Sequence, residues 1–254
     1  MKALALLMLS LLASVAPAQE ITVAAAADLH FAVDEIASRF QAESGIHVHA
    51  IYGSSGNFYQ QIQNGAPFDV FLSANVDYPK KLEAAGLTQP GTYFEYARGR
   101  IVLAVPANST LGVKQGLKVL ANPAVKKVAI ADPAHAPYGM AAVAALKAEH
   151  IYEQVSTKLV AGENISQAAS FVLSGAADAG IIALSLVKAP AAGAQVRFEA
   201  IPANDYPPIL QASVVLRSSK QQKAAEKFLA FLRGKEAATI FRQYGFEVPE
   251  ATEP

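Results

Sequence analysis

Short apolar strands alternate with amphipathic helices along this chain, and this alternation limits its possible folds more than any other feature. The apolar run at 21–27 is followed by Leu29, Val33, Ile36 and Phe40, which share one face of a helix. Further strands are predicted at 47–52, 68–74, 99–105, 126–131, 158–161, 179–184, 197–201 and 209–216. Such an order predicts an α/β fold with mostly parallel strands between layers of helices.

Four strand-to-helix junctions, called corners below, consist of small or polar residues. They are Ala27-Asp28, Gly53 to Asn57, Ala136 to Gly139 and Gly162 to Ser166, and none contains Arg or Lys. In parallel sheets such corners lie at the carboxyl ends of strands, where ligands bind. Two corners belong to each half of the chain, so two lobes would place all four across one cleft. A single continuous sheet is the alternative.

The second corner has two interpretations. Its glycines allow a close approach of the backbone, its serines offer hydroxyl groups, and the helix that follows begins with unpaired N–H groups. Such a corner can hold an anion without a cation. A plain serine helix cap has the same composition.

The expected domains follow from the crossings between lobes, which we place near 99–105 and 206–216. Lobe 1 is then 19–103 plus 207–254, and lobe 2 is 104–206. Residues 1–18 have the pattern of a signal peptide: a positive end, an apolar core and a small-residue cleavage motif that ends at Ala18. We therefore expect export to a periplasm-like compartment, with an uncleaved anchor as the alternative.

Composition narrows the class of partner. The chain has 21 Lys and Arg against 21 Asp and Glu, so it lacks the electrostatic footprint for nucleic acid or a membrane surface. It has no cysteine, which fits an exported protein that folds without disulfides. We expect a monomer whose ligand specificity comes from a local site.

Other chemistry is less well supported. A hydrolase elbow needs Gly-x-Ser-x-Gly, but Asn57 occupies the last position. His47 and His49 share a strand face and could hold a metal, but no third ligand is evident. No nucleotide-binding loop is present.

Three further residues have a structural and a functional interpretation. His135 lies beside the third corner, where a loop histidine is favoured over a ligand contact. Asp69 and Asp178 stand at turn-to-strand entries, where capping of the turn is the simpler interpretation.

A cleft lined by backbone N–H groups, serine hydroxyls and a tyrosine hydroxyl has many donors and little positive charge. That set suits a small oxyanion without protons of its own, which only accepts hydrogen bonds. Neutral donors and helix N-termini can hold such a dianion and still release it.

Several segments, in this order, resemble a known family, the periplasmic molybdate-binding component of ABC transporters. They are Ile21 to Leu29, Gly53 to Gly56, Gly65 to Ala74, Asp132 to Gly139, Gly175 to Gly180 and Phe241 to Phe246. The resemblance implies a two-lobed periplasmic-binding-protein fold of type II, with the ligand in the interlobe cleft. It also implies capture of molybdate or tungstate for a membrane permease, with no catalytic residues, no cofactor and no direct protein ligand to molybdenum.

The resemblance also implies four ligand contacts. They are Asp28, Ser55 with its hydroxyl and N–H, Tyr138, and the backbone N–H of Ile165. Family members commonly have Ser or Asn at the position of Asp28, and some have a second tyrosine where this chain has Ala183.

Asp28 is the important departure, since a carboxylate beside a dianion is repulsive by several kcal/mol even at an effective dielectric constant of about 20. Three explanations are open: Asp28 caps its own helix and offers only its N–H, it is protonated, or the ligand is not molybdate. Alternatives to a molybdate-binding protein are capture of another oxyanion such as sulfate, an exported enzyme, or an interaction module without a ligand.

Overall fold

The structure is a computed structural model that describes residues 19–190 and 192–249. The predicted signal peptide, residues 1–18, lies outside the described residues. Within the described ranges no helix has the length and apolar character needed to cross a membrane.

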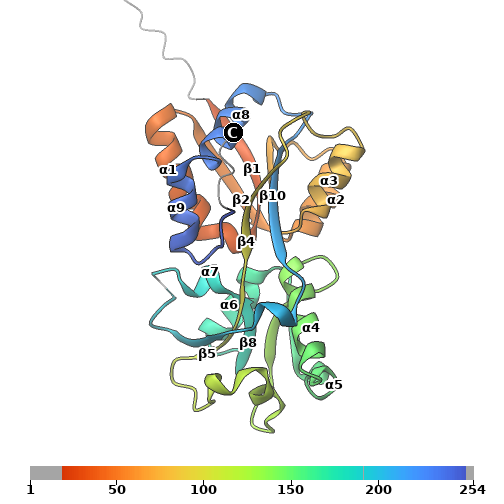
Figure 1. The fold of residues 1–254 in the computed structure, drawn as a ribbon, viewed down its shortest axis with the longest axis vertical. Coiled ribbons are helices and arrows are strands. Elements are labelled where there is room, and N and C mark those ends of the chain that lie inside the picture. Colours follow the sequence, from red (N-terminus) through yellow and green to blue (C-terminus); the bar gives the residue numbers. More distant parts are fainter. Residues whose placement is uncertain (1–18, 191, 250–254) are drawn as a thin grey trace, which may run out of the picture.

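The strands form two five-stranded sheets, one in each of two lobes (Figure 1). The strands are β1 (Glu20–Ala26), β2 (His47–Gly53), β3 (Val70–Ser73), β4 (Phe94–Gly99), β5 (Ile101–Pro106), β6 (Val128–Ala131), β7 (Leu159–Gly162), β8 (Ala179–Ala183), β9 (Val196–Ala200) and β10 (Ile209–Val215). The strand order is β2-β1-β3-β10-β4 in the first sheet and β7-β6-β8-β5-β9 in the second. The predicted two-lobed α/β fold is confirmed, and the alternative of a single continuous sheet is wrong.

Both sheets have the same construction. In the first, β1 lies parallel between β2 and β3, and β10 lies antiparallel between β3 and β4. In the second, β6 lies parallel between β7 and β8, and β5 lies antiparallel between β8 and β9. Each sheet is therefore mixed. Its parallel half ends at the predicted corners, and its antiparallel half contains a strand next to a crossing between the lobes.

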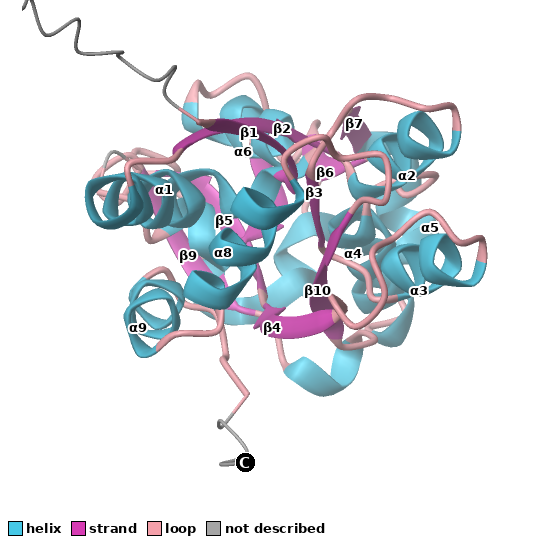
Figure 2. Cartoon of the chain, turned by 90° about the horizontal axis from the view of Figure 1, so that it is seen from above, coloured by secondary structure: helices cyan, strands magenta, loops and turns pink. Residues whose placement is uncertain are grey.

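The helices cover both faces of each sheet. They are α1 (His30–Ser44), α2 (Ser55–Gln63), α3 (Asp77–Ala84), α4 (Pro137–Ala148), α5 (Tyr152–Val155), α6 (Ile165–Leu173), α7 (Leu184–Val187), α8 (Gln222–Leu232) and α9 (Lys235–Gln243). Short 3-10 helices are η1 (Ala27–Leu29), η2 (Val113–Ala121), η3 (Ser156–Lys158) and η4 (Ala203–Asp205). From above, α1, α8 and α9 lie on one side of the first sheet and α2 and α3 on the other (Figure 2).

Helix α1 shows how the apolar periodicity is used. Val33, Ile36 and Phe40 are buried on its inner face, as predicted. Gly45 ends the helix in the left-handed region, at a φ of 70°, which glycine adopts without strain. The Phe40 ring packs edge-on against Phe228 of α8 with a centroid separation of 5.2 Å, so the C-terminal helices close the core of the first lobe.

The chain crosses between the lobes at Arg100 and again before β10. The single strand predicted at 99–105 is in fact two strands in different sheets, since β4 ends at Gly99 and β5 begins at Ile101. β4 was not predicted because Glu95 and Arg98 interrupt its apolar pattern. Both crossings are short, and they bring the two sets of corners face to face.

Candidate functional site

The four predicted corners meet between the lobes. They follow β1, β2, β6 and β7, and lead into η1, α2, α4 and α6. Asp28, Ser55, Tyr138 and Ile165 are between 1% and 3% exposed. Each predicted site residue is therefore buried at the start of a helix or 3-10 helix.

Three hydrogen bonds join the corners across the lobes. The Gly56 N–H donates to the His135 carbonyl at 3.0 Å. The Ser166 hydroxyl donates to the Ala27 carbonyl at 2.9 Å, and the Tyr138 hydroxyl donates to Asp28 Oδ2 at 2.8 Å. The corners are thus in direct contact, and the lobes are closed on one another.

The two serines of the second corner have different roles: Ser54 caps a helix, and Ser55 is available to a ligand. Ser54 is the cap of α2, and its Oγ accepts from the Asn57 N–H at 3.4 Å. Ser55 Oγ instead accepts from the Ala74 N–H at 2.9 Å. Among the described residues nothing accepts the Ser55 hydroxyl proton, and its N–H is at the first position of the helix, where no intrahelical acceptor exists. Ser55 can therefore offer two donors to a ligand.

The fourth corner offers one donor from the backbone. The Asn164 side chain caps α6 by accepting from the N–H groups of Ser166 and Gln167 at 3.0 and 3.1 Å. The Ile165 N–H precedes these two and makes no hydrogen bond within the described part of the chain. The cap thus leaves this N–H available beside the first corner.

Asp28 is bound from both lobes. Its Oδ2 accepts from Tyr138 at 2.8 Å and from Gln211 Nε2 at 2.5 Å, and its backbone carbonyl accepts from the Ser185 hydroxyl at 2.7 Å. Its Oδ1 is buried and has no hydrogen-bond partner among the described residues. Burial raises the pKa of Asp28 to about 6, although the bonds from Gln211 and Tyr138 lower it in part.

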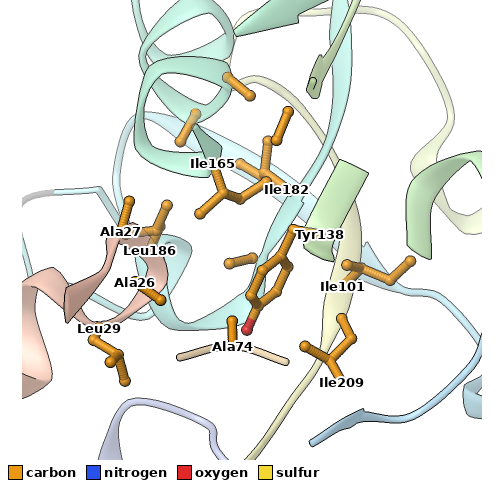
Figure 3. Packing of buried hydrophobic residues seen from close by; sticks show 14 of the residues in the cluster. Ala26, Ala27, Leu29, Ala74, Ile101, Tyr138, Ile165, Ile182, Leu186 and Ile209 are labelled. Atoms are coloured by element: carbon orange, nitrogen blue, oxygen red, sulfur yellow. The ribbon is translucent and has the colours of Figure 1, made fainter. Parts of the chain in front are cut away.

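The Asp28 side chain does not cap its own helix, because neither η1 nor α1 has a side-chain cap. The first of the three explanations for this carboxylate is therefore wrong. Tyr138 is also less free than expected, since its hydroxyl proton goes to Asp28. Figure 3 shows the Tyr138 ring entering between the lobes with its hydroxyl toward Ala74.

Tyr96 and Gln211 complete a buried polar network that the sequence analysis missed. The Tyr96 hydroxyl lies 3.1 Å from Gln211 Oε1, so the amide nitrogen of Gln211 faces Asp28. Burial and the nearby Asp28 hold the pKa of Tyr96 well above its usual range. Gln211 interrupts the apolar run of β10 and is fully buried. The only sequence signal for this network was a glutamine within the apolar run at 209–216.

Comparison with known proteins shows that the chain matches a protein family. The model for bacterial extracellular solute-binding proteins matches residues 21–247. The chain belongs to the bacterial extracellular solute-binding protein family. Hinge closure around a ligand is a known motion of periplasmic binding proteins, and the hydrogen bonds between the corners hold the two lobes in contact in this structure.

Two relatives of this solute-binding protein are molybdate-binding proteins called ModA. The one from Azotobacter vinelandii is 40% identical over 236 residues, 93% of each chain. The one from Rhodobacter capsulatus is 40% identical over 237 residues, covering 92% of this chain and 91% of the relative. The solved periplasmic molybdate-binding protein of Azotobacter vinelandii superposes with a TM-score of 0.86 at 35% identity, over 91% of this chain and all of that one.

His135 joins the lobes of this solute-binding protein. Its Nδ1 lies 2.8 Å from Ser54 Oγ, and its carbonyl accepts from Gly56. Its Nε2 lies 3.6 Å from Asp132 Oδ2. The loop histidine of the sequence analysis is thus an interlobe contact, which no feature of its neighbouring sequence revealed.

The remaining candidates have structural environments. His47 and His49 are exposed, and the described residues contain no group of three or more potential metal ligands. Asp69 accepts from the Thr22 N–H, and Asp178 accepts from the N–H groups of Lys126 and Lys127. Both aspartates therefore have structural roles, but the turn-capping interpretation is wrong, because each carboxylate accepts from the backbone of a segment more than 40 residues away and not from its own turn.

Proposed function

We propose that this solute-binding protein captures molybdate, and also tungstate, and delivers it to the membrane permease of an ABC transporter. The two relatives that are 40% identical over more than nine-tenths of the chain are molybdate-binding proteins. The protein would act as a monomer in the periplasm after cleavage behind Ala18, without a cofactor. Molybdenum enters only as its oxyanion, so no side chain binds the metal directly.

The observation that carries the proposal is the meeting of four corners that contain no Lys or Arg and that have unused hydrogen-bond donors. Ser55 contributes a hydroxyl proton and an N–H, and Ile165 contributes an N–H. Helices α2 and α6 begin at these residues, and the N-terminus of a helix favours a negative charge. Tyr138 and Asp28 close the site from the opposite corners.

Neutral donors suit a carrier that must also release its ligand. Hydrogen bonds to an ionised acceptor are stronger than those between neutral groups, yet no Lys or Arg lies in the four corners to hold the anion permanently. Opening of the lobes separates the donors, so the anion leaves when the permease favours the open state.

An exported enzyme is the alternative with a geometric basis, because His135 contacts Ser54 through one ring nitrogen and Asp132 through the other. However, Ser54 Oγ also accepts from the Asn57 N–H and is 4% exposed, as a helix cap would be. We expect the unaltered chain and Ser54→Ala to hydrolyse p-nitrophenyl acetate equally slowly. Hydrolysis by the unaltered chain that is lost in Ser54→Ala would favour the enzyme.

The proposal is tested by calorimetric titration of the mature chain with molybdate, tungstate, sulfate and phosphate at neutral pH. We expect saturable binding of molybdate and tungstate, and displacement of neither by excess sulfate. Displacement by sulfate at equal concentration would indicate a sulfate-binding protein of the same fold. No heat and no thermal shift with any of the four anions would contradict the proposal.

Ser55→Ala is expected to weaken molybdate binding about 5- to 150-fold, or about 1–3 kcal/mol, because one hydrogen bond to a charged ligand is lost. The dissociation constant from calorimetry measures the effect. Ser174→Ala, on the exposed end of α6, is the matched control. Equal dissociation constants for both variants would remove Ser55 from the site.

A further inference from the structure

The Asp28 carboxyl group is buried with one oxygen used and the other unused. Oδ2 accepts two hydrogen bonds, from the hydroxyl of Tyr138 and the amide of Gln211. Oδ1 is buried and has no partner among the described residues. A buried polar atom without a partner is rare and costly in native proteins, so Oδ1 marks a position where a further hydrogen bond is expected.

The groups around Asp28 are neutral. Tyr138 faces it from α4, Gln211 from β10 and Tyr96 from β4, and the carbonyl binds Ser185 of α7. Burial and Asp28 raise the pKa of Tyr138 and Tyr96, so both stay protonated.

The two histidines beside the first and third corners are engaged elsewhere. His30, next in sequence, is 43% exposed and lies 3.5 Å from Asp34, and its ring stacks on Phe31. His135 contacts Ser54 and Asp132. Within the described residues no Lys, Arg or His side chain forms an ion pair with Asp28.

An ionised Asp28 would therefore meet an incoming dianion with no cation to offset the repulsion. Protonation of this carboxyl group removes its negative charge and turns one of its oxygens into an O–H donor. We propose that Asp28 is a carboxylic acid in the anion-bound protein, that its Oδ1–H donates to the oxyanion, and that each capture event takes up one proton from solvent. This inference rests on the proposed function.

The hydrogen bonds determine which oxygen holds the proton. Tyr138 and Gln211 are both donors to Oδ2, so Oδ2 remains an acceptor and the proton resides on Oδ1. Tyr96 fixes this arrangement because its hydroxyl binds Oε1 of Gln211, which leaves only the amide N–H groups facing Asp28. Even with the lobes in contact, burial raises the pKa of Asp28 only to about 6, so without an anion the carboxyl group is mostly ionised at neutral pH and gains the proton on binding.

The experiment is a molybdate titration between pH 6.5 and pH 8.5, repeated in Tris and MOPS, whose ionisation heats differ. We expect uptake of about one proton per anion, and a dissociation constant that rises about tenfold per pH unit, as linkage requires for one proton. A flat dissociation constant with no proton uptake would overturn the proposal while leaving molybdate binding established.

Asp28→Asn separates this role from a structural one. The amide oxygen can accept from Tyr138 and Gln211, and the amide nitrogen can donate in place of Oδ1–H. We expect the variant to bind molybdate at pH 8.5 at least tenfold more tightly than the unaltered chain, without proton uptake. Asp77→Asn, an exposed carboxylate of the first lobe, is the control and should keep the pH dependence.

Two outcomes would count against the proposal in different ways. Binding of phosphate in preference to molybdate, without proton uptake, would show that Asp28 stays ionised and accepts a proton from the ligand. Absence of binding by both the unaltered chain and Asp28→Asn, at every pH, would overturn the proposed function together with the inference.

Discussion

Gly56→Ala is expected to weaken molybdate binding about 10- to 100-fold, because it obstructs the closed state. A Cβ at this position would lie 2.6 Å from the His135 carbonyl oxygen, which belongs to the other lobe. It would also disturb the bond from the Gly56 N–H to that carbonyl. Overpacking of this kind costs about 1–3 kcal/mol. Since the clash joins two lobes, the cost falls on closure and leaves an open form intact.

The measurement combines calorimetry with small-angle scattering. We expect Gly56→Ala to remain more extended than the unaltered chain at saturating molybdate, with little change in the unfolding midpoint of the free protein. Gly193→Ala is the control, because a Cβ there meets nothing within 4 Å. Equal affinity in both variants would show that the Gly56–His135 contact is not needed for capture.

Asp28→Asn is expected to remove the part of the loss in unfolding free energy with rising pH that Asp28 causes in the ligand-free protein. The folded pKa of about 6 lies above the ordinary value of 3.8, so the folded chain holds this proton more tightly than the unfolded chain does. The stabilisation from Asp28 is therefore complete below pH 3.8 and is lost as the pH rises through 6. Asparagine has no proton to lose, so the variant avoids this loss.

The difference in unfolding free energy between Asp28→Asn and the unaltered chain should rise by about 2 kcal/mol from pH 4 to pH 7.5. Urea denaturation without ligand, at several pH values, measures it. Comparison of the two chains cancels the pH dependence of the other carboxyl groups, which are the same in both. A difference that does not change with pH would mean that Asp28 has an ordinary pKa when folded.

The alternation of strands and helices was sufficient to predict two α/β lobes, because each helix shows its apolar face in sequence. Val33, Ile36 and Phe40 are one example. The crossing region was harder. β4 contains Glu95 and Arg98, and its place in the first sheet depends on pairing with β10, more than 100 residues away in the chain. Local periodicity carries no information about such a partner.

The candidate site divides in the same way. Asp28, Ser55, Tyr138 and Ile165 were placed at corners by sequence, because small residues and helix starts are local features. Gln211 and Tyr96 lie on strands β10 and β4, far from any corner in sequence, and only folding brings them to Asp28. The Ser54–His135 contact likewise joins two lobes.

By itself, the sequence determined the lobes, the four corners without Lys or Arg, and the unusual carboxylate at Asp28. Only the tertiary structure decided what that carboxylate does. Whether Asp28 caps a helix, pairs with a cation or holds a proton depends on burial and on neighbours that come from the other lobe and from a distant strand. Desolvation and hydrogen bonding act through space, so a pKa is a property of the fold and cannot be obtained from the residue's neighbours in the chain.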